Sequence, residues 1–135
     1  MDLSKAMHIA ASGMRVQGAR MRVVAENLAN ADSSALAPGG EPYRRKTIAF
    51  DNALDRELGV ELVRVARYGV DPSEPQLRHD PGHPAADPDG YVRMPNVQPL
   101  MELMDLREAQ RSFEANLNAL GLARAMVQRT LELLR

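Results

Sequence analysis

Hydrophobic residues recur at alternating intervals of three and four along the last third of the chain, residues 99–135. With Gln110 and Arg124 as its polar members, the pattern holds without a slip from residue 103 to residue 134. Its hydrophobic members are Leu103, Leu106, Phe113, Leu117, Leu120, Val127, Leu131 and Leu134. This interval is the a/d seam of a coiled-coil helix. Because about 35 helical residues extend roughly 50 Å, we expect the helix to find partners outside a compact core.

A second seam of the same period covers residues 2–31. Asp2 is placed to cap a helix that begins at the next residue. Apart from Ala10 and the polar Gln17, the seam members are large and hydrophobic: Leu3, Met7, Met14, Met21, Val24 and Leu28. An amphipathic helix packed on a globular core has the same period. The narrow, Met-rich stripe and the two glycines Gly13 and Gly18 favour an adaptable interface with close backbone approach.

The middle of the chain, residues 32–98, has a different composition. All nine prolines lie between Pro38 and Pro99, so neither terminal seam contains an internal helix breaker. We expect strands over residues 43–50, 60–68 and 91–94, and a helical turn over residues 51–58. Three short strands bury little area unless another element covers them. The predicted fold is mainly α, with long N- and C-terminal coiled-coil helices (2–31 and 99–135) flanking a Pro/Gly-rich β insert (32–98).

Composition excludes several classes of function. The net charge is −1, so no strong electrostatic field favours nucleic acid. The chain has no cysteine, which excludes disulfides, thiolate metal sites and thiol nucleophiles. It also lacks an apolar run long enough for a bilayer. The basic region and apolar core of a cleaved secretory signal are missing, so we expect a chain that stays in the cytosol or leaves it by a route without such a signal.

Candidate chemistry is confined to one loop, His79 to Asp89. Two histidines and three aspartates lie within these eleven residues and could ligate a divalent metal, as a metal-dependent hydrolase would require. Their spacing matches no standard metal motif, and the prolines and glycines between them are typical of an ordered loop. The chain also lacks a phosphate-binding glycine loop and a nucleophile elbow. We therefore predict no enzyme activity, no cofactor, no metal and no small-molecule substrate.

Several motifs resemble those of the flagellar rod and hook proteins. Residues 25–31, Ala-Glu-Asn-Leu-Ala-Asn-Ala, look like the signature of that family. Residues 39–46, 80–87 and 90–97 are similar to the proximal rod proteins of the flagellar basal body, and residues 112–116, Ser-Phe-Glu-Ala-Asn, to the closing motif. The polar residues of these motifs are Glu26, Asn27, Asn30, Asn96, Glu114 and Asn116.

The chain departs from the family pattern at two positions. Gln98 stands where the family often has Asp or Asn, so Pro99 is expected as the first helical residue behind a poor cap. Phe113 stands where the family often has Tyr, which removes only a hydroxyl.

The resemblance implies a structural subunit without enzymatic activity. Members of the family cross the inner membrane through the flagellar type III export apparatus and polymerise helically in the periplasm. Their terminal helices pack in the inner wall of a hollow rod. The implied partners are further copies of the chain, other rod proteins and the export apparatus. Narrow seams on both termini independently favour a contact that repeats into an open helix. The alternative is an autonomous coiled-coil adaptor that forms no filament.

Overall fold

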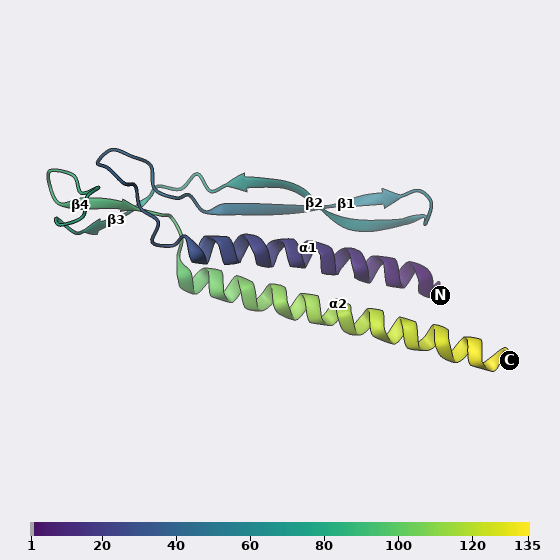
Figure 1. The fold of residues 1–135 in the computed structure, drawn as a ribbon. Coiled ribbons are helices and arrows are strands. Elements are labelled where there is room, and N and C mark those ends of the chain that lie inside the picture. Colours follow the sequence, from purple (N-terminus) through teal and green to yellow (C-terminus); the bar gives the residue numbers. More distant parts are fainter. Residues whose placement is uncertain (1) are drawn as a thin grey trace. The chain divides into compact units, whose positions relative to one another are not determined.

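The computed structural model describes residues 2–135, which form two long helices and four strands (Figure 1). In chain order the elements are α1 (Leu3–Ala29), β1 (Lys46–Asp55), β2 (Val60–Val70), β3 (Gln76–His79), β4 (Tyr91–Met94) and α2 (Pro99–Leu133). The prediction of a mainly helical chain with a small β insert is confirmed. Within the described residues, neither helix combines the length and the apolar content needed to cross a membrane.

The chain divides into two compact units, and each unit is built from separate stretches of sequence. The first unit contains the chain up to Met21, Ile48–Arg67 and Arg107–Arg135. The second contains Arg22–Thr47 and Tyr68–Leu106. Both helices and the β1–β2 pair therefore contribute to each unit.

In the first unit, α1 lies between α2 and the strands β1 and β2 (Figure 1). The helices run antiparallel, because Gly13 contacts Asn116 while Arg20, further along α1, forms a 3.5 Å ion pair with the earlier Glu108. A Cβ added at Gly13 would lie 2.8 Å from the Asn116 amide. Glycine at this position therefore allows the two helices to approach closely.

The β1–β2 hairpin corrects one prediction. The first strand is predicted over residues 43–50 and a helical turn over 51–58, but the strand runs from Lys46 to Asp55 and only the next four residues turn. Asp51 has a low strand propensity, yet its carboxylate binds both Nε and Nη2 of Arg64 across the hairpin at 2.7 and 3.2 Å. Cross-strand pairing therefore overrides local propensity. The second predicted strand is confirmed, with an end two residues later.

A compact turn closes this hairpin. The Asp55 carboxylate accepts hydrogen bonds from the N–H groups of Glu57 and Leu58, each at 3.0 Å. Gly59 then adopts a positive φ of 66° and donates its N–H to the Asp55 carbonyl at 2.8 Å. A side chain at Gly59 would be strained in this conformation.

The second unit contains the antiparallel β3–β4 pair, in which His79 lies opposite Tyr91 and Gln76 opposite Met94. The rings of His79 and Tyr91 meet edge to face at 5.0 Å. The prediction of β4 is confirmed, but β3 was missed because its four side chains are all exposed and show no alternation. A small core beside β4 consists of Ala85, Val92 and Met94.

Both helix starts agree with the sequence. The Asp2 carboxylate accepts hydrogen bonds from the N–H groups of Ser4 and Lys5, at 3.0 and 3.2 Å, which confirms the predicted cap. The second helix begins at Pro99, as predicted, where proline needs no N–H partner. The Gln98 backbone carbonyl accepts the first helical hydrogen bond, from Glu102, at 3.1 Å.

Candidate assembly surface and polar junction

The seam residues of α1 are covered to different degrees. Val24 is buried. The other large hydrophobic members are half-buried: Leu3, Met7, Met14, Met21 and Leu28. A second row, Ser12, Val16, Ala19 and Val23, is buried as well. Burial along more than one face fits the position of α1 between α2 and the hairpin in the first unit (Figure 1).

The seam of α2 divides into two rows. Leu106, Phe113, Leu120 and Val127 are half-buried within the chain. The other row is exposed, with 52% exposure at Leu103, 48% at Leu117 and 60% at Leu131. Leu134 follows the first row in spacing but lies beyond the end of α2 and is 78% exposed. The intramolecular contact of α2 therefore accounts for only half of the predicted seam.

The fully buried positions of α2 are Glu102, Ala109 and Ala123, which sequence reasoning missed. They recur at intervals of seven, and Asn116 completes the series. Small and polar side chains at a heptad interval, between the larger apolar residues, were the available signal. A search for large apolar residues discards that signal.

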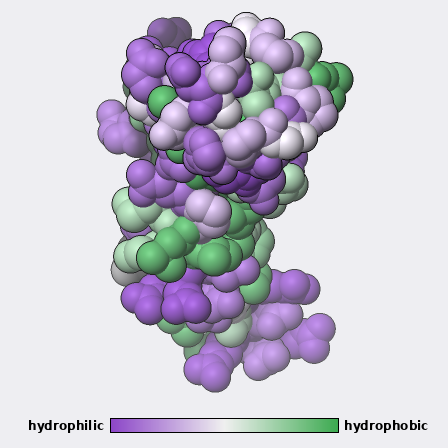
Figure 2. Space-filling view, turned by 90° about the vertical axis from the view of Figure 1, so that its left-hand side faces the viewer, coloured by the Kyte–Doolittle hydropathy of each residue, from purple (hydrophilic) through white to green (hydrophobic). Residues whose placement is uncertain are grey.

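Further large apolar residues extend the exposed surface of α2. They are Leu100, Met101, Met104, Leu122, Met126 and Leu133. Figure 2 shows hydrophobic residues in green exposed among hydrophilic ones in purple. We call the exposed apolar residues of α2 its outer face. Exposed large apolar residues often mark a protein-contact surface, so the outer face is a candidate for protein contact.

A network of polar side chains, the polar junction, lies in the second unit around Asn27, which is fully buried. Its Oδ1 accepts hydrogen bonds from the Tyr43 hydroxyl and the Lys46 N–H, both at 2.8 Å. Its Nδ2 donates to the Lys46 carbonyl at 2.9 Å and to the Glu102 carboxylate at 3.4 Å. All four hydrogen-bonding positions of the amide are thus used. Burial and the nearby Glu26 carboxylate raise the pKa of Tyr43, which keeps its hydroxyl a donor.

The charge of Glu102 is matched by Arg45, whose Nε donates to the Glu102 carboxylate. Only 1% of the Glu102 side chain is exposed, so this pair is largely desolvated on the carboxylate side. Arg45 also lies 3.6 Å from Asp71. Burial alone would lower the pKa of Arg45, but the hydrogen bond to Glu102 and the charges of both carboxylates raise it overall. The junction therefore holds its charges as partnered ions.

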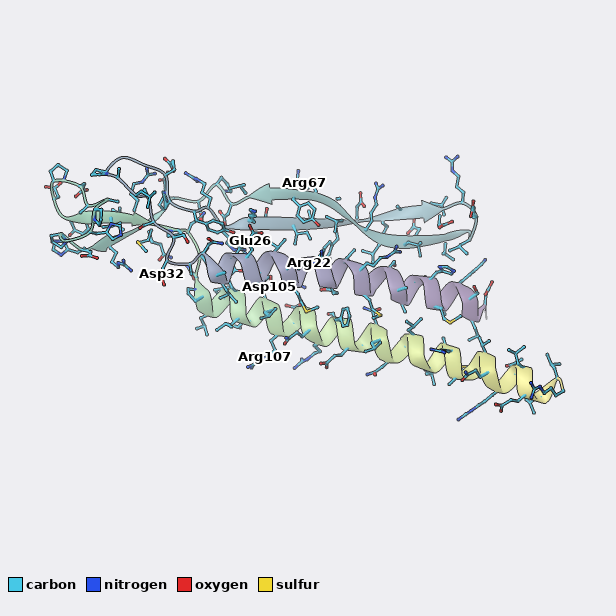
Figure 3. The ribbon with its side chains drawn as sticks, in the orientation of Figure 1. Arg22, Glu26, Asp32, Arg67, Asp105 and Arg107 are labelled. Atoms are coloured by element: carbon cyan, nitrogen blue, oxygen red, sulfur yellow. The ribbon has the colours of Figure 1, made fainter. Side chains whose placement is uncertain are left out.

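Two further motif residues, Asn96 and Glu26, belong to the polar junction. Asn96 accepts the Arg45 N–H at 2.8 Å and donates to the Asp71 carbonyl at 3.1 Å. It also bonds Ser73. Glu26 pairs with Lys46, and Figure 3 places Glu26 beside Arg22 at the end of α1. The junction connects α1, β1 and the start of α2 within this unit.

The remaining motif residues have other positions. Asn30 donates to the Glu26 carbonyl at 2.9 Å and accepts from Ser33, so it closes the end of α1. Asn116 donates to the Ser112 carbonyl one turn earlier and faces Gly13. Glu114 is exposed and makes no hydrogen bond or ion pair with any described residue. Five of the six motif residues thus have intramolecular contacts.

The loop from His79 to Asp89 is an ordered turn. Nδ1 of His83 accepts the Ala85 N–H at 3.0 Å, and its Nε2 lies 3.1 Å from the Ser34 hydroxyl. The backbone of Asp80 bonds Gly90 at 2.9 Å. Among residues 2–135, no group of three His, Asp or Glu side chains is arranged to hold a metal ion.

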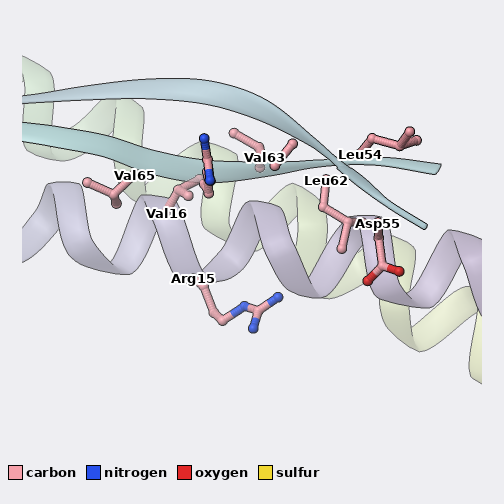
Figure 4. Close-up of a pocket in the computed structure, with 9 residues that line it drawn as sticks. Arg15, Val16, Leu54, Asp55, Leu62, Val63 and Val65 are labelled. Carbon is pink, nitrogen blue, oxygen red and sulfur yellow. The ribbon is translucent and has the colours of Figure 1, made fainter. Parts of the chain in front are cut away.

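A pocket of about 430 Å³ lies in the first unit between α1 and the hairpin (Figure 4). Val16 of α1 and Leu62, Val63 and Val65 of β2 supply apolar walls. Figure 4 shows Leu62 pointing from the hairpin towards α1. We call this pocket the hairpin groove.

Comparisons with known proteins identify a matching family and several relatives of this chain. A family described as "Flagellar basal body rod FlgEFG protein C-terminal" matches residues 89–133. The chain is 50% identical over 133 residues to the flagellar basal-body rod protein FlgC of Agrobacterium fabrum, covering 98% of this chain and 96% of that protein. It is 39% identical to the FlgC protein of Salmonella typhimurium over 98% of each chain. The FlgC protein of Bacillus subtilis is 36% identical, with 94% and 95% covered.

Proposed function

The chain belongs to the FlgC family of flagellar basal-body rod proteins, and we propose that it assembles by burying the outer face of α2 and the seam of α1 against neighbouring subunits. It is thus a structural subunit of the flagellar rod. The observation that carries the proposal is the exposure of large leucine and methionine side chains along α2. This exposed surface does not contribute to the packing of the isolated chain.

Burial of exposed leucine supplies free energy for assembly. Fully burying one Leu or Met side chain contributes about 1.5–3 kcal/mol. Leu103, Leu117 and Leu131 lie at heptad intervals on one stripe of α2, separated by the polar Gln110 and Arg124. We infer that a neighbouring subunit packs along this stripe, which has the spacing of a coiled-coil seam. A contact between two different surfaces of one subunit repeats into an open helix, as a rod requires.

The wider setting of the subunit follows from its family. We propose that it is exported through the flagellar type III apparatus without a cleaved signal and assembles in the periplasm with itself and other rod proteins. Residues 2–31 and 99–135 are the proposed assembly segments, and residues 32–98 the insert. The apolar outer face suits a protein partner rather than nucleic acid or a small-molecule substrate, and no enzyme chemistry or cofactor is proposed.

The test uses two adjacent residues of α2, Leu117 and Asn118, both exposed in the isolated chain. Leu117→Asp places a carboxylate in the proposed contact, where desolvating it costs several kcal/mol. In a strain without the wild-type copy we expect normal expression but no completed rod and no swimming. Asn118→Asp is the matched control and is expected to be mild. Normal swimming with Leu117→Asp would exclude the outer face from assembly.

The autonomous adaptor is separated by a second measurement. It would show helicity that rises with protein concentration at micromolar levels, and no filament. A strain carrying Leu117→Asp would then still build its rods.

A further inference from the structure

Several charged residues of the first unit have no ion-pair partner among the described residues, and Glu114 and Arg15 are two of them. Glu114 on α2 and Arg15 on α1 are both exposed, and neither makes an ion pair or a side-chain hydrogen bond there. Arg15 is among the residues that line the hairpin groove, and Figure 4 shows its side chain extending from the side of α1 that faces away from the strands. The opposite charges of the two residues allow them to pair across an interface between copies.

No contact within the chain explains why residue 121 is a glycine. A Cβ added there would meet nothing within 4 Å, and its φ is not positive. Glycine inside a helix costs about 1 kcal/mol relative to alanine. By contrast, the glycine at position 13 is needed for the contact with Asn116. The missing side chain at Gly121 leaves space for a neighbouring backbone.

Glu114 and Gly121 share one stripe of α2 with Leu117 and Arg124, because their spacing is three, four and three residues. The stripe thus presents an acidic residue, a leucine, a gap and a basic residue in order. The hairpin groove offers complementary chemistry. It has apolar walls, with Arg15 and Asp55 among its lining residues. Asp55 makes no ion pair with a described residue.

We propose that the stripe of residues 114–124 of a second copy of this chain docks on the hairpin groove. In that contact Leu117 enters the groove, Glu114 pairs with Arg15, Arg124 faces Asp55, and Gly121 allows close approach. The proposal rests on the proposed function and names the surface that receives the outer face. The two surfaces differ, so the contact is heterologous and extends a polymer rather than closing a dimer.

Charge reversal tests the pairing in cells. Arg15→Glu and Glu114→Arg each place like charges together, which should lower the yield of completed rods roughly tenfold or more. The double variant restores opposite charges and should recover rods and swimming. A double variant no better than either single variant would overturn the pairing.

Cross-linking tests the groove directly, because the chain has no native cysteine that could form a competing disulfide. Two single-cysteine copies, Leu62→Cys and Leu117→Cys, are expressed together, and oxidised basal bodies are examined on a non-reducing gel. We expect a band with the mass of two copies, lost when Asn118→Cys replaces Leu117→Cys or when either partner is expressed alone. A cross-link to a different protein, or none in assembled basal bodies, would overturn docking of a second copy.

Different experimental results would overturn the docking proposal and the proposed function. If Leu117→Asp abolishes rods but Leu62 and Leu117 never cross-link, the outer face assembles elsewhere and only the groove is wrong. If Leu117→Asp leaves rods intact, the proposed function itself is wrong.

Discussion

The inner face of α2 is most deeply buried at Glu102, Ala109 and Ala123, whereas its outer face exposes Leu103, Leu117 and further large apolar residues. An ordinary surface helix keeps its large apolar residues on the inner side, whereas α2 divides its leucines between the two faces, with Leu106 and Leu120 half-buried. Alanine buries little area and a paired carboxylate contributes specificity more than stability. We infer from this difference that the two faces have different roles. The inner face sets how the chain packs on itself, and the outer face keeps its hydrophobic area for neighbours.

The largest expected effect comes from breaking the polar junction. Glu102→Ala leaves the Arg45 guanidinium with Asp71 alone and deprives the buried Asn27 amide of one acceptor. We expect a loss of roughly 3 kcal/mol in the free energy of unfolding of the monomer. Urea denaturation of the dilute protein provides the measurement.

The control for this prediction lies on the same helix. Glu108→Ala removes the Arg20 ion pair, in which the glutamate is 71% exposed. Surface pairs contribute little, so we expect a loss of under about 1 kcal/mol. Equal losses in the two variants would show that burial does not distinguish the inner face.

Much of the fold could be predicted from the sequence because the helices carry strong periodic signals. The Asp2 cap, the Pro99 start and the strand over residues 91–94 all follow from local rules and are confirmed. The extension of β1 to Asp55 could not be read from the sequence, since its support is the Arg64 side chain thirteen residues away. The strand Gln76–His79 gave no signal because water faces every side chain.

The polar junction was only partly predictable. Asn27 and Asn96 were identified as motif residues, but the sequence could not show that these two residues, far apart in the chain, bond the same segment, residues 45–46. Arg45 and Glu102 carry no local pattern, since their pairing depends on a contact 57 residues apart. The predicted assembly seam stays a prediction. The structure adds that half of its α2 members are available for contact.

Substitution of Gly121, on the exposed side of α2, is expected to have a smaller effect of the opposite sign, namely a gain in stability. Gly121→Ala adds a methyl group where nothing lies within 4 Å, so the free energy of unfolding of the monomer should rise by about 1 kcal/mol. Gly13→Ala gains the same helix propensity but meets Asn116 at 2.8 Å, so it should gain little or lose stability. Thermal and urea unfolding compare the two. A larger gain at position 13 would contradict the close packing of the inner face.

The smallest expected effect is the pH dependence of monomer stability. It depends on charged groups such as those of the junction, and the apolar outer face does not contribute to it. Hydrogen bonds from Ser73, followed by the charge of Arg45, lower the pKa of Asp71 below its ordinary value of 3.8. Hydrogen bonds to arginines likewise lower the pKa of Glu41 and Asp51. A carboxyl group with a lowered folded-state pKa contributes stability that is fully present above its unfolded pKa and is lost as pH falls through the folded one. Monomer stability should therefore be level from pH 7 to about 5 and decline from about pH 4 downwards.

Asp71→Asn tests the origin of that decline. It removes one of the titrating groups, so the variant should be less stable than the wild type at pH 7 and show a shallower loss below about pH 4. Asp89→Asn, at an exposed loop position, is the matched control and should leave the slope unchanged. Urea midpoints measured at several pH values between 3 and 7 give both slopes. Because the outer face is built from leucine and methionine, its contribution to assembly should not follow the same curve. An identical flattening in the two variants would show that the decline is a general charge effect rather than a property of the junction.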